Sequence, residues 1–133
     1  MITMDICILE NSSFHSNCLE VSLKKIIDKH QLNNIQIQKY TNSKEILMNI
    51  EHHKYHHIYF LDIEMNATDA NLIELNHFIR KSVPLAVIVI ISHHTDYMPL
   101  FFEHLLASNH YIEKDCDQSQ FDRRIEKILL NCL

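Results

Sequence analysis

The sequence predicts a single α/β domain, built as a doubly wound parallel sheet of five strands in a (βα)5 arrangement. Short apolar or β-branched runs alternate along the chain with segments whose apolar residues repeat at helical spacing. This alternation is typical of a parallel sheet covered by helices on both faces. The length of 133 residues suits one domain and is enough to bury a core without a metal or disulfide.

Five runs are expected to be strands because they are short and rich in β-branched or other apolar residues. Leu85–Ile91 is the most apolar of them, which predicts a central strand buried on both faces. Ile35–Tyr40 alternates between apolar and polar residues, which favours a position nearer a sheet edge. In chain order the expected strands are Thr3–Leu9, Ile35–Tyr40, Ile58–Leu61 ending at Asp62, Leu85–Ile91 and His110–Ile112.

Each strand is followed by a segment with helical spacing. Ser12 or Ser13 is expected to cap the first helix, which carries Val21 in its apolar stripe, and Asn42-Ser43 is expected to cap the second. Pro84 marks the break after the third helix. The apolar stripes of the first two expected helices reach Ile27 and Ile50, and the third helix runs to about Arg80. The last two are expected from Thr95 or Asp96 to Leu106 and from Ser119 to Leu130.

The composition excludes several classes of function. The formal net charge is −5, so the chain lacks the basic surface of a protein that binds nucleic acid or an anionic membrane by itself. The sequence has no glycine, which excludes the Gly-rich phosphate loops of ATPases, kinases and dinucleotide-dependent dehydrogenases. The longest apolar runs are too short to span a bilayer, and no basic, apolar leader opens the chain. We therefore expect a cytoplasmic protein.

The spacing of cysteine and histidine does not predict a metal centre. The four cysteines show no short metal-type spacing, so we expect reduced thiols, with Cys7 buried in a strand and the others on or near helices. Four histidines lie within residues 52–57, but no acid or cysteine there is placed to complete a tetrahedral site. We therefore expect this segment to be a solvated polar loop.

Polar residues follow four of the five expected strands. Glu10-Asn11 follow the first strand, Asp62 the third, Ser92 the fourth and Glu113-Lys114 the fifth. In an open parallel sheet the carboxyl ends of the strands lie at one edge, and ligands bind there at the point where the strand order reverses. We therefore expect two acids, an amide, a hydroxyl and an ammonium group to converge at this edge.

This set of residues resembles the receiver domain of bacterial two-component response regulators, and the resemblance covers essentially the whole chain. The fold that it implies is the flavodoxin-like or CheY-like arrangement. Three segments resemble more narrowly the regulators of peptide quorum-sensing, competence and bacteriocin systems, which carry a LytTR DNA-binding domain after the receiver. These segments are YFLDIEM (59–65), VIVIISHHTDYMPLFF (87–102) and YIEKD (111–115).

The resemblance implies a role for each residue at the sheet edge. Asp62 matches the phosphoacceptor, Ser92 the switch hydroxyl, Tyr111 the switch aromatic and Lys114 the phosphate-binding lysine. Lys114 is followed by Asp115 where most receivers have a proline, and an acid there fits the narrower group.

The resemblance also implies a Mg²⁺ site. Glu10 and Asn11 match the acidic pair that helps to hold the ion, and Asp62 and the backbone carbonyl of Glu64 supply further oxygens. Asn11 stands where the family has a second acid, so the site loses one formal negative charge. A neutral amide oxygen is the weaker ligand, and we expect a reduced affinity for Mg²⁺.

The implied function is that of a phosphoacceptor. Residues 1–133 are expected to form one receiver domain without an output domain, phosphorylated on Asp62 by a sensor histidine kinase. The last two helices and the fifth strand are expected to form a homodimer or docking face. DNA would be reached only through a LytTR domain that this chain lacks, so transcription regulation would not involve direct DNA binding by this domain. The domain is not expected to bind membranes or to be a metabolic enzyme.

Two other interpretations remain open at this point. In the first, Asn11 makes the chain a degenerate pseudo-receiver that acts through protein contacts without phosphorylation. In the second, the same doubly wound fold serves an enzyme or a flavin carrier, although no Gly-rich or Ser/Thr-rich loop follows the first strand.

Overall fold

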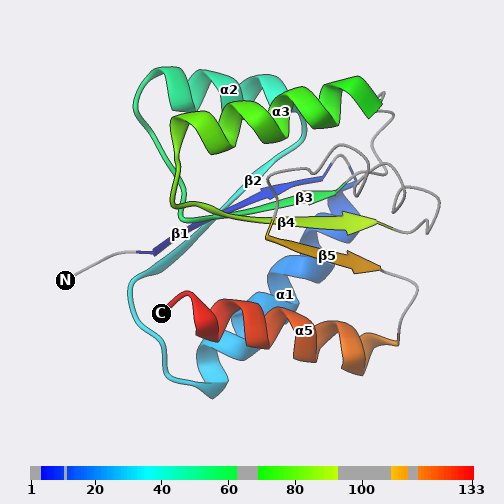
Figure 1. Cartoon of the computed structure of the whole chain (residues 1–133). Coiled ribbons are helices and arrows are strands. Elements are labelled where there is room, and N and C mark those ends of the chain that lie inside the picture. Colours follow the sequence, from blue (N-terminus) through cyan, green and yellow to red (C-terminus); the bar gives the residue numbers. More distant parts are fainter. Residues whose placement is uncertain (1–3, 11, 63–68, 93–108, 114–116) are drawn as a thin grey trace.

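The apolar runs of the sequence form strands that pair in parallel, and the segments between them form helices (Figure 1). The computed structural model describes residues 4–10, 12–62, 69–92, 109–113 and 117–133. The predicted helix from 95 or 96 to 106 lies outside these residues. The described elements are β1 (Met4–Leu9), α1 (Ser13–Lys29), β2 (Ile35–Tyr40), α2 (Ser43–Glu51), β3 (Ile58–Asp62), α3 (Asp69–Ser82), β4 (Val87–Ser92), β5 (His110–Glu113) and α5 (Gln118–Asn131).

The sheet is doubly wound, as the sequence predicted. Its strand order is β2-β1-β3-β4-β5, and every neighbouring pair is parallel. The chain passes from β1 outward to β2, then returns past β1 to β3 and continues toward β5. The winding direction therefore reverses between β1 and β3, which makes their carboxyl ends the switch point where such folds bind ligands.

Two apolar layers hold the sheet between its helices. Side chains alternate between the two faces of each strand, so β3 contributes Ile58 and Phe60 to one layer and Tyr59 and Leu61 to the other. The first layer packs against α1 and α5, and the second against α2 and α3 (Figure 1). All five residues of β3 are buried, so this central strand is held on both faces.

Side-chain caps fix the start of three helices. The Ser12 side chain accepts a hydrogen bond from the His15 backbone N–H, and the Asn42 side chain accepts one from the Glu45 backbone N–H. The cap of α5 is Asp117, which accepts from the Gln120 N–H. Ser12 and Asn42 confirm the helix starts that the sequence predicted, because these residue types satisfy the otherwise unpaired N–H groups of the first turn.

Three residues lie elsewhere than the sequence predicted. Val21 is 51% exposed on α1 and outside the core, because the buried stripe of α1 runs through other positions, among them Leu19 and Leu23. Leu85 is 95% exposed and precedes β4, because the Ala86 N–H bonds to the Val83 carbonyl and forms a turn there. His56 was expected in a solvated loop but is only 5% exposed.

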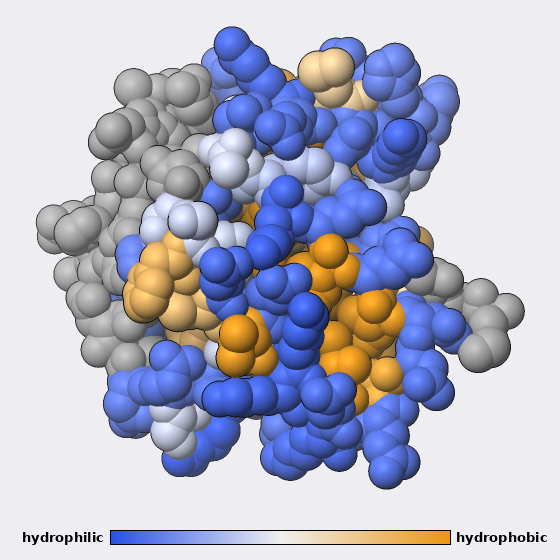
Figure 2. Space-filling view, turned by 180° about the vertical axis from the view of Figure 1, so that it is seen from behind, coloured by the Kyte–Doolittle hydropathy of each residue, from blue (hydrophilic) through white to orange (hydrophobic). Residues whose placement is uncertain are grey.

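The cysteines lie where the sequence predicted, as far as the structure describes them. Cys7 is buried in β1, Cys18 is exposed, Cys132 is half-buried, and all three are free thiols; Cys116 lies outside the described residues. Figure 2 shows hydrophobic patches on an otherwise mostly hydrophilic surface, on the side that faces away in Figure 1. None of the helices described is long and apolar enough to cross a membrane.

Candidate functional site

Two buried acids, Glu10 and Asp62, lie next to each other at the carboxyl edge of the sheet. Glu10 is 3% exposed and Asp62 is 6% exposed. Leu9 pairs with Leu61 across β1 and β3, so the residues that follow them are also neighbours. The alternation of side chains carries both acids to the α1 and α5 side of the sheet, since each stands two residues after a member of that core layer. Parallel strands lie about 4.8 Å apart, so the backbone positions that carry the two acids are adjacent.

The backbone around Glu10 holds its carboxylate in place. The Glu10 N–H donates to the Tyr40 carbonyl at 3.0 Å, which continues the pairing of β1 and β2 by one residue. The Ser12 backbone N–H donates to Glu10 Oε1 at 3.0 Å. The glutamate side chain is thereby folded back over the first turn of α1, near the positive end of the helix dipole. The sequence predicted Ser12 only as a helix cap. The bond to Glu10 comes from the Ser12 backbone N–H, which every residue except proline has, so the residue type does not predict it.

Ser92 and Tyr111 lie on the other side of the same edge. Ser92 is the last residue of β4 and is 0% exposed, and it pairs with Glu113 of β5. Tyr111 is half-buried, pairs with Ile90, and packs against the core layer under α2 and α3. Ile88 and Ile90 belong to that layer, so the alternation along β4 carries Ser92 to the same side as Tyr111. The hydroxyl and the aromatic ring are therefore neighbours on one face.

The structure thus brings four of the predicted site residues to one edge. Glu10 and Asp62 share one face, while Ser92 and Tyr111 share the other. The remaining three predicted residues, Asn11, Glu64 and Lys114, lie outside the residues that the structure describes.

The acid pair fits a hard divalent cation such as Mg²⁺. Two buried carboxylates on one face repel each other, and a bound cation removes that repulsion. Mg²⁺ binds through one or two carboxylates and completes its octahedral shell with water and phosphate oxygens. Within residues 4–10, 12–62, 69–92, 109–113 and 117–133, no cluster of three or more His, Cys, Asp or Glu side chains could hold a metal. Glu10 and Asp62 would therefore hold a cation together with other oxygens.

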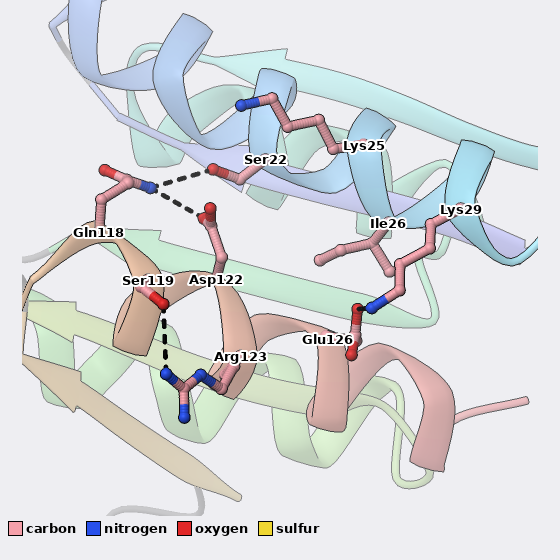
Figure 3. A pocket seen from close by; sticks show the side chains of 9 residues that line it. All are labelled: Ser22, Lys25, Ile26, Lys29, Gln118, Ser119, Asp122, Arg123 and Glu126. Carbon is pink, nitrogen blue, oxygen red and sulfur yellow. Dashed lines mark hydrogen bonds and ion pairs between the residues drawn. The ribbon is translucent and has the colours of Figure 1, made fainter.

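A cavity lies between α1 and α5, and neither acid of the pair is in its lining (Figure 3). This cleft of about 480 Å³ has Ile26 in its lining and hydrogen-bonded polar groups along its rim. Gln118 bonds to Ser22 on the facing helix and to Asp122, and Lys29 forms an ion pair with Glu126 at 3.1 Å. These contacts join the two helices, and the lining contains no nucleophile paired with a base. The acid pair is therefore a better candidate for the functional site than this cleft.

Comparison with known proteins shows the fold. No protein-family model matches the sequence, and no curated protein matches it significantly. A response regulator receiver domain (CheY-like) from Methylobacillus flagellatus has a TM-score of 0.71 at 17% identity, over 99% of this chain and 100% of that chain. A pilus assembly-related protein from Burkholderia pseudomallei K96243 has a TM-score of 0.73 at 8% identity, over 98% and 89%. The BeF3-activated DrrB receiver domain has a TM-score of 0.66 at 12% identity, over 96% and 98%.

These similarities confirm the predicted fold class. The chain has the five-stranded parallel sheet and flanking helices of the CheY-like receiver fold.

Proposed function

We propose that this chain is a phosphoacceptor receiver domain of a two-component system and that Asp62 accepts the phosphoryl group. The observation that carries the proposal is the position of Asp62: it ends the central strand, is 6% exposed, and lies beside the buried Glu10 at the switch point of the sheet. Receiver-type structures with the same fold support it, one of them described as activated by BeF3.

The proposed reaction transfers a phosphoryl group from a phosphohistidine of a partner kinase. An Asp62 carboxylate oxygen attacks phosphorus, a P–O bond forms as the P–N bond breaks, and the histidine nitrogen keeps the electron pair and takes up a proton. The product is a high-energy acyl phosphate. Because phosphoryl transfer depends on position and charge neutralisation, a weak nucleophile such as a carboxylate suffices in this setting.

Two cations would neutralise the transferred group. Glu10 and Asp62, with Asn11 and the Glu64 backbone carbonyl, would hold Mg²⁺, which neutralises charge on the phosphoryl oxygens when bound. Lys114 would act as a point charge on the phosphoryl group from the end of β5.

Ser92 and Tyr111 would transmit the structural effect of phosphorylation from the site to the protein surface. Asp62 and Ser92 leave the sheet on opposite faces, but Asp62 pairs with Ile91, the residue before Ser92. A phosphoryl group that extends past the sheet edge from Asp62 would therefore reach the Ser92 hydroxyl, which would donate a hydrogen bond to a phosphoryl oxygen and draw the end of β4 inward. Tyr111 lies on the same face and would move into the space vacated, which would repack the surface formed by β5 and the last two helices. That surface would mediate homodimerisation or docking.

The narrower assignment is to regulators of the LytTR type in quorum-sensing, competence or bacteriocin systems, located in the cytoplasm. The segments 59–65, 87–102 and 111–115 support it by sequence resemblance. The genomic DNA immediately downstream of the Leu133 codon tests it. A reading frame that continues into a LytTR domain supports the assignment, and any other output domain contradicts it.

Acetyl phosphate with Mg²⁺ tests the phosphoacceptor role, with intact-protein mass spectrometry as the readout. We expect the protein to gain one phosphoryl group, to lose it in hydroxylamine, and to gain none in EDTA. Asp62→Ala should abolish the gain, whereas Asp28→Ala, which removes an exposed acid of α1, should retain it. A phosphoryl group that persists in Asp62→Ala would overturn the proposal.

Asn11 favours a second candidate, the pseudo-receiver that works without phosphate. This candidate predicts no phosphoryl gain at millimolar Mg²⁺ and no chemical-shift change with BeF3. Recovery of phosphorylation in Asn11→Asp would show that the missing acid is the cause.

A further inference from the structure

His56 occupies a buried polar cluster at the opposite end of β3 from Asp62. It precedes β3, is 5% exposed, and its ring packs edge-on against Tyr40 and Tyr59 with centroids 5.8 and 5.4 Å apart. Its backbone N–H donates to the Tyr59 hydroxyl at 3.0 Å. The side chain therefore lies between the edge strand β2 and the start of the central strand.

The hydrogen bonds of the cluster determine which ring nitrogen of His56 carries the proton. Asn49 of α2 donates to the Tyr40 hydroxyl at 2.7 Å, so Tyr40 directs its own proton to Gln38 Oε1. Gln38 Oε1 also lies 3.2 Å from His56 Nε2. Because this oxygen only accepts, Nε2 must be the protonated nitrogen. The chain of bonds joins α2, β2 and the segment that leads into β3.

The surroundings of the other ring nitrogen, Nδ1, disfavour its protonation. His56 Nδ1 is buried and has no hydrogen-bond partner among the residues that the structure describes. A proton on Nδ1 would create a buried cation with an unsatisfied donor, which is costly in an apolar setting. The cluster is therefore compatible only with neutral His56.

The next residue pairs with the start of β1. His57 Nδ1 accepts the Asp5 backbone N–H at 2.9 Å, and the His57 N–H donates to the Asp5 carbonyl at 2.8 Å. These two bonds continue the pairing of β1 with β3, so the segment that carries His56 is held against the sheet.

We infer that His56 is an acid-sensitive contact, which joins α2, β2 and the start of β3 while its ring is neutral and releases them when its Nδ1 is protonated.

Burial of His56 outweighs the one charged group that opposes its effect. Burial lowers the pKa of His56, the Asp5 carboxylate opposes this shift, and a charge on His57 would add to it. Burial raises the pKa of Tyr59 to about 12, and burial also raises the pKa values of Tyr40 and Cys7, so these groups stay neutral. The titratable groups around the cluster are Asp5 and Cys7 of β1, Tyr40 of β2, Glu45 of α2, Tyr59 of β3, and Tyr55 and His57 of the loop.

The sign of the pH dependence follows from the lowered pKa. The unfolded chain protonates His56 at its ordinary pKa of about 6.5, whereas the folded chain resists protonation until lower pH. The contribution of His56 is therefore complete above pH of about 6.5 and is lost as the pH falls from there to the folded-state pKa. Each pH unit in that window lowers the folding equilibrium constant by up to ~10-fold.

Urea unfolding between pH 5 and pH 8 tests the inference with a substitute that does not titrate. His56→Gln keeps a donor near the Nε2 position. We expect this variant to lose the contribution of His56 to the pH dependence, which is a change of up to ~10-fold in the folding equilibrium constant for each pH unit. The control His52→Gln, an exposed histidine of the same loop, should behave like the wild type.

A second measurement keeps the inference testable if a variant fails to fold. In wild-type protein, ¹⁵N imidazole shifts should report a proton on Nε2 and none on Nδ1 of His56 at neutral pH, and His56 should titrate below the ordinary histidine pKa of about 6.5. The inference is overturned if His56→Gln retains the wild-type pH dependence, or if His56 titrates at that ordinary pKa.

Discussion

Replacing Glu10 by Gln removes one of the two buried carboxylates and keeps the size of the side chain. Glu10 and Asp62 follow a paired position on strands about 4.8 Å apart, so we take a charge separation of about 5 Å. With an effective dielectric constant of about 20, two like charges at that distance repel by about 3 kcal/mol. Gln still accepts the Ser12 N–H, but as a neutral acceptor, which costs about 1 kcal/mol.

The substitution should therefore act in opposite directions with and without the cation. In EDTA, we expect Glu10→Gln to raise the free energy of unfolding by at most about 2 kcal/mol, the difference between those two effects, since the proposed Lys114 ammonium would offset part of the repulsion. Its affinity for Mg²⁺ should fall by about 30-fold or more, since even in water one charge about 4 Å from a divalent ion contributes about 2 kcal/mol.

Urea unfolding in EDTA and in a Mg²⁺ titration measures both effects. Wild-type protein at a hundred times its dissociation constant should gain about 2.7 kcal/mol of stability from the ion. Glu51→Gln, which removes an exposed acid of α2, is the matched control and should change neither quantity. If Glu10→Gln lowers the stability in EDTA and leaves the Mg²⁺ affinity unchanged, the reasoning about the acid pair is refuted.

Three further predictions concern the sheet edge and the frame that supports it. Arg80→Ala should lower the free energy of unfolding by about 2–4 kcal/mol, because the guanidinium donates to the Pro84 and Ala86 carbonyls and to Asn109 Oδ1 at 2.6, 2.7 and 2.8 Å; a loss below about 0.5 kcal/mol in urea unfolding would contradict this. Ser92→Ala should still be phosphorylated by acetyl phosphate but should show no change in the NMR signals of β5, and a full response would exclude a switch role for the hydroxyl. Asn11→Asp should tighten Mg²⁺ binding by about tenfold in calorimetry by restoring one charge, whereas equal or weaker affinity would mean that this residue does not face the ion.

The sequence predicted the fold because the deciding features are local. Each described strand is a run of apolar or β-branched residues, and the caps Ser12 and Asn42 are of the types that satisfy a first helical turn. Leu85 was wrongly included in β4, because an apolar residue in a turn after Pro84 has the same composition as one in a strand. The hydrogen bond from the Ala86 N–H to the Val83 carbonyl is what distinguishes the turn from a strand here.

The sequence predicted those site residues whose positions follow from the parallel topology of the sheet. Glu10, Asp62 and Ser92 each end a strand or follow one, so the sheet brings them to one edge. The support of Glu10 by the Ser12 N–H was not predictable, because the donor is a backbone group. The burial of His56 was not predictable either, since its partners Tyr40 and Gln38 are brought to it by long-range packing.

The most direct test of the central claim is a crystal structure of the protein grown with BeF3 and Mg²⁺. We predict BeF3 bound to an Asp62 carboxylate oxygen, with Mg²⁺ coordinated by Asp62 and Glu10 beside it. An Asp62 side chain free of BeF3 under saturating conditions, or Mg²⁺ bound at a place that excludes Glu10, would contradict the account.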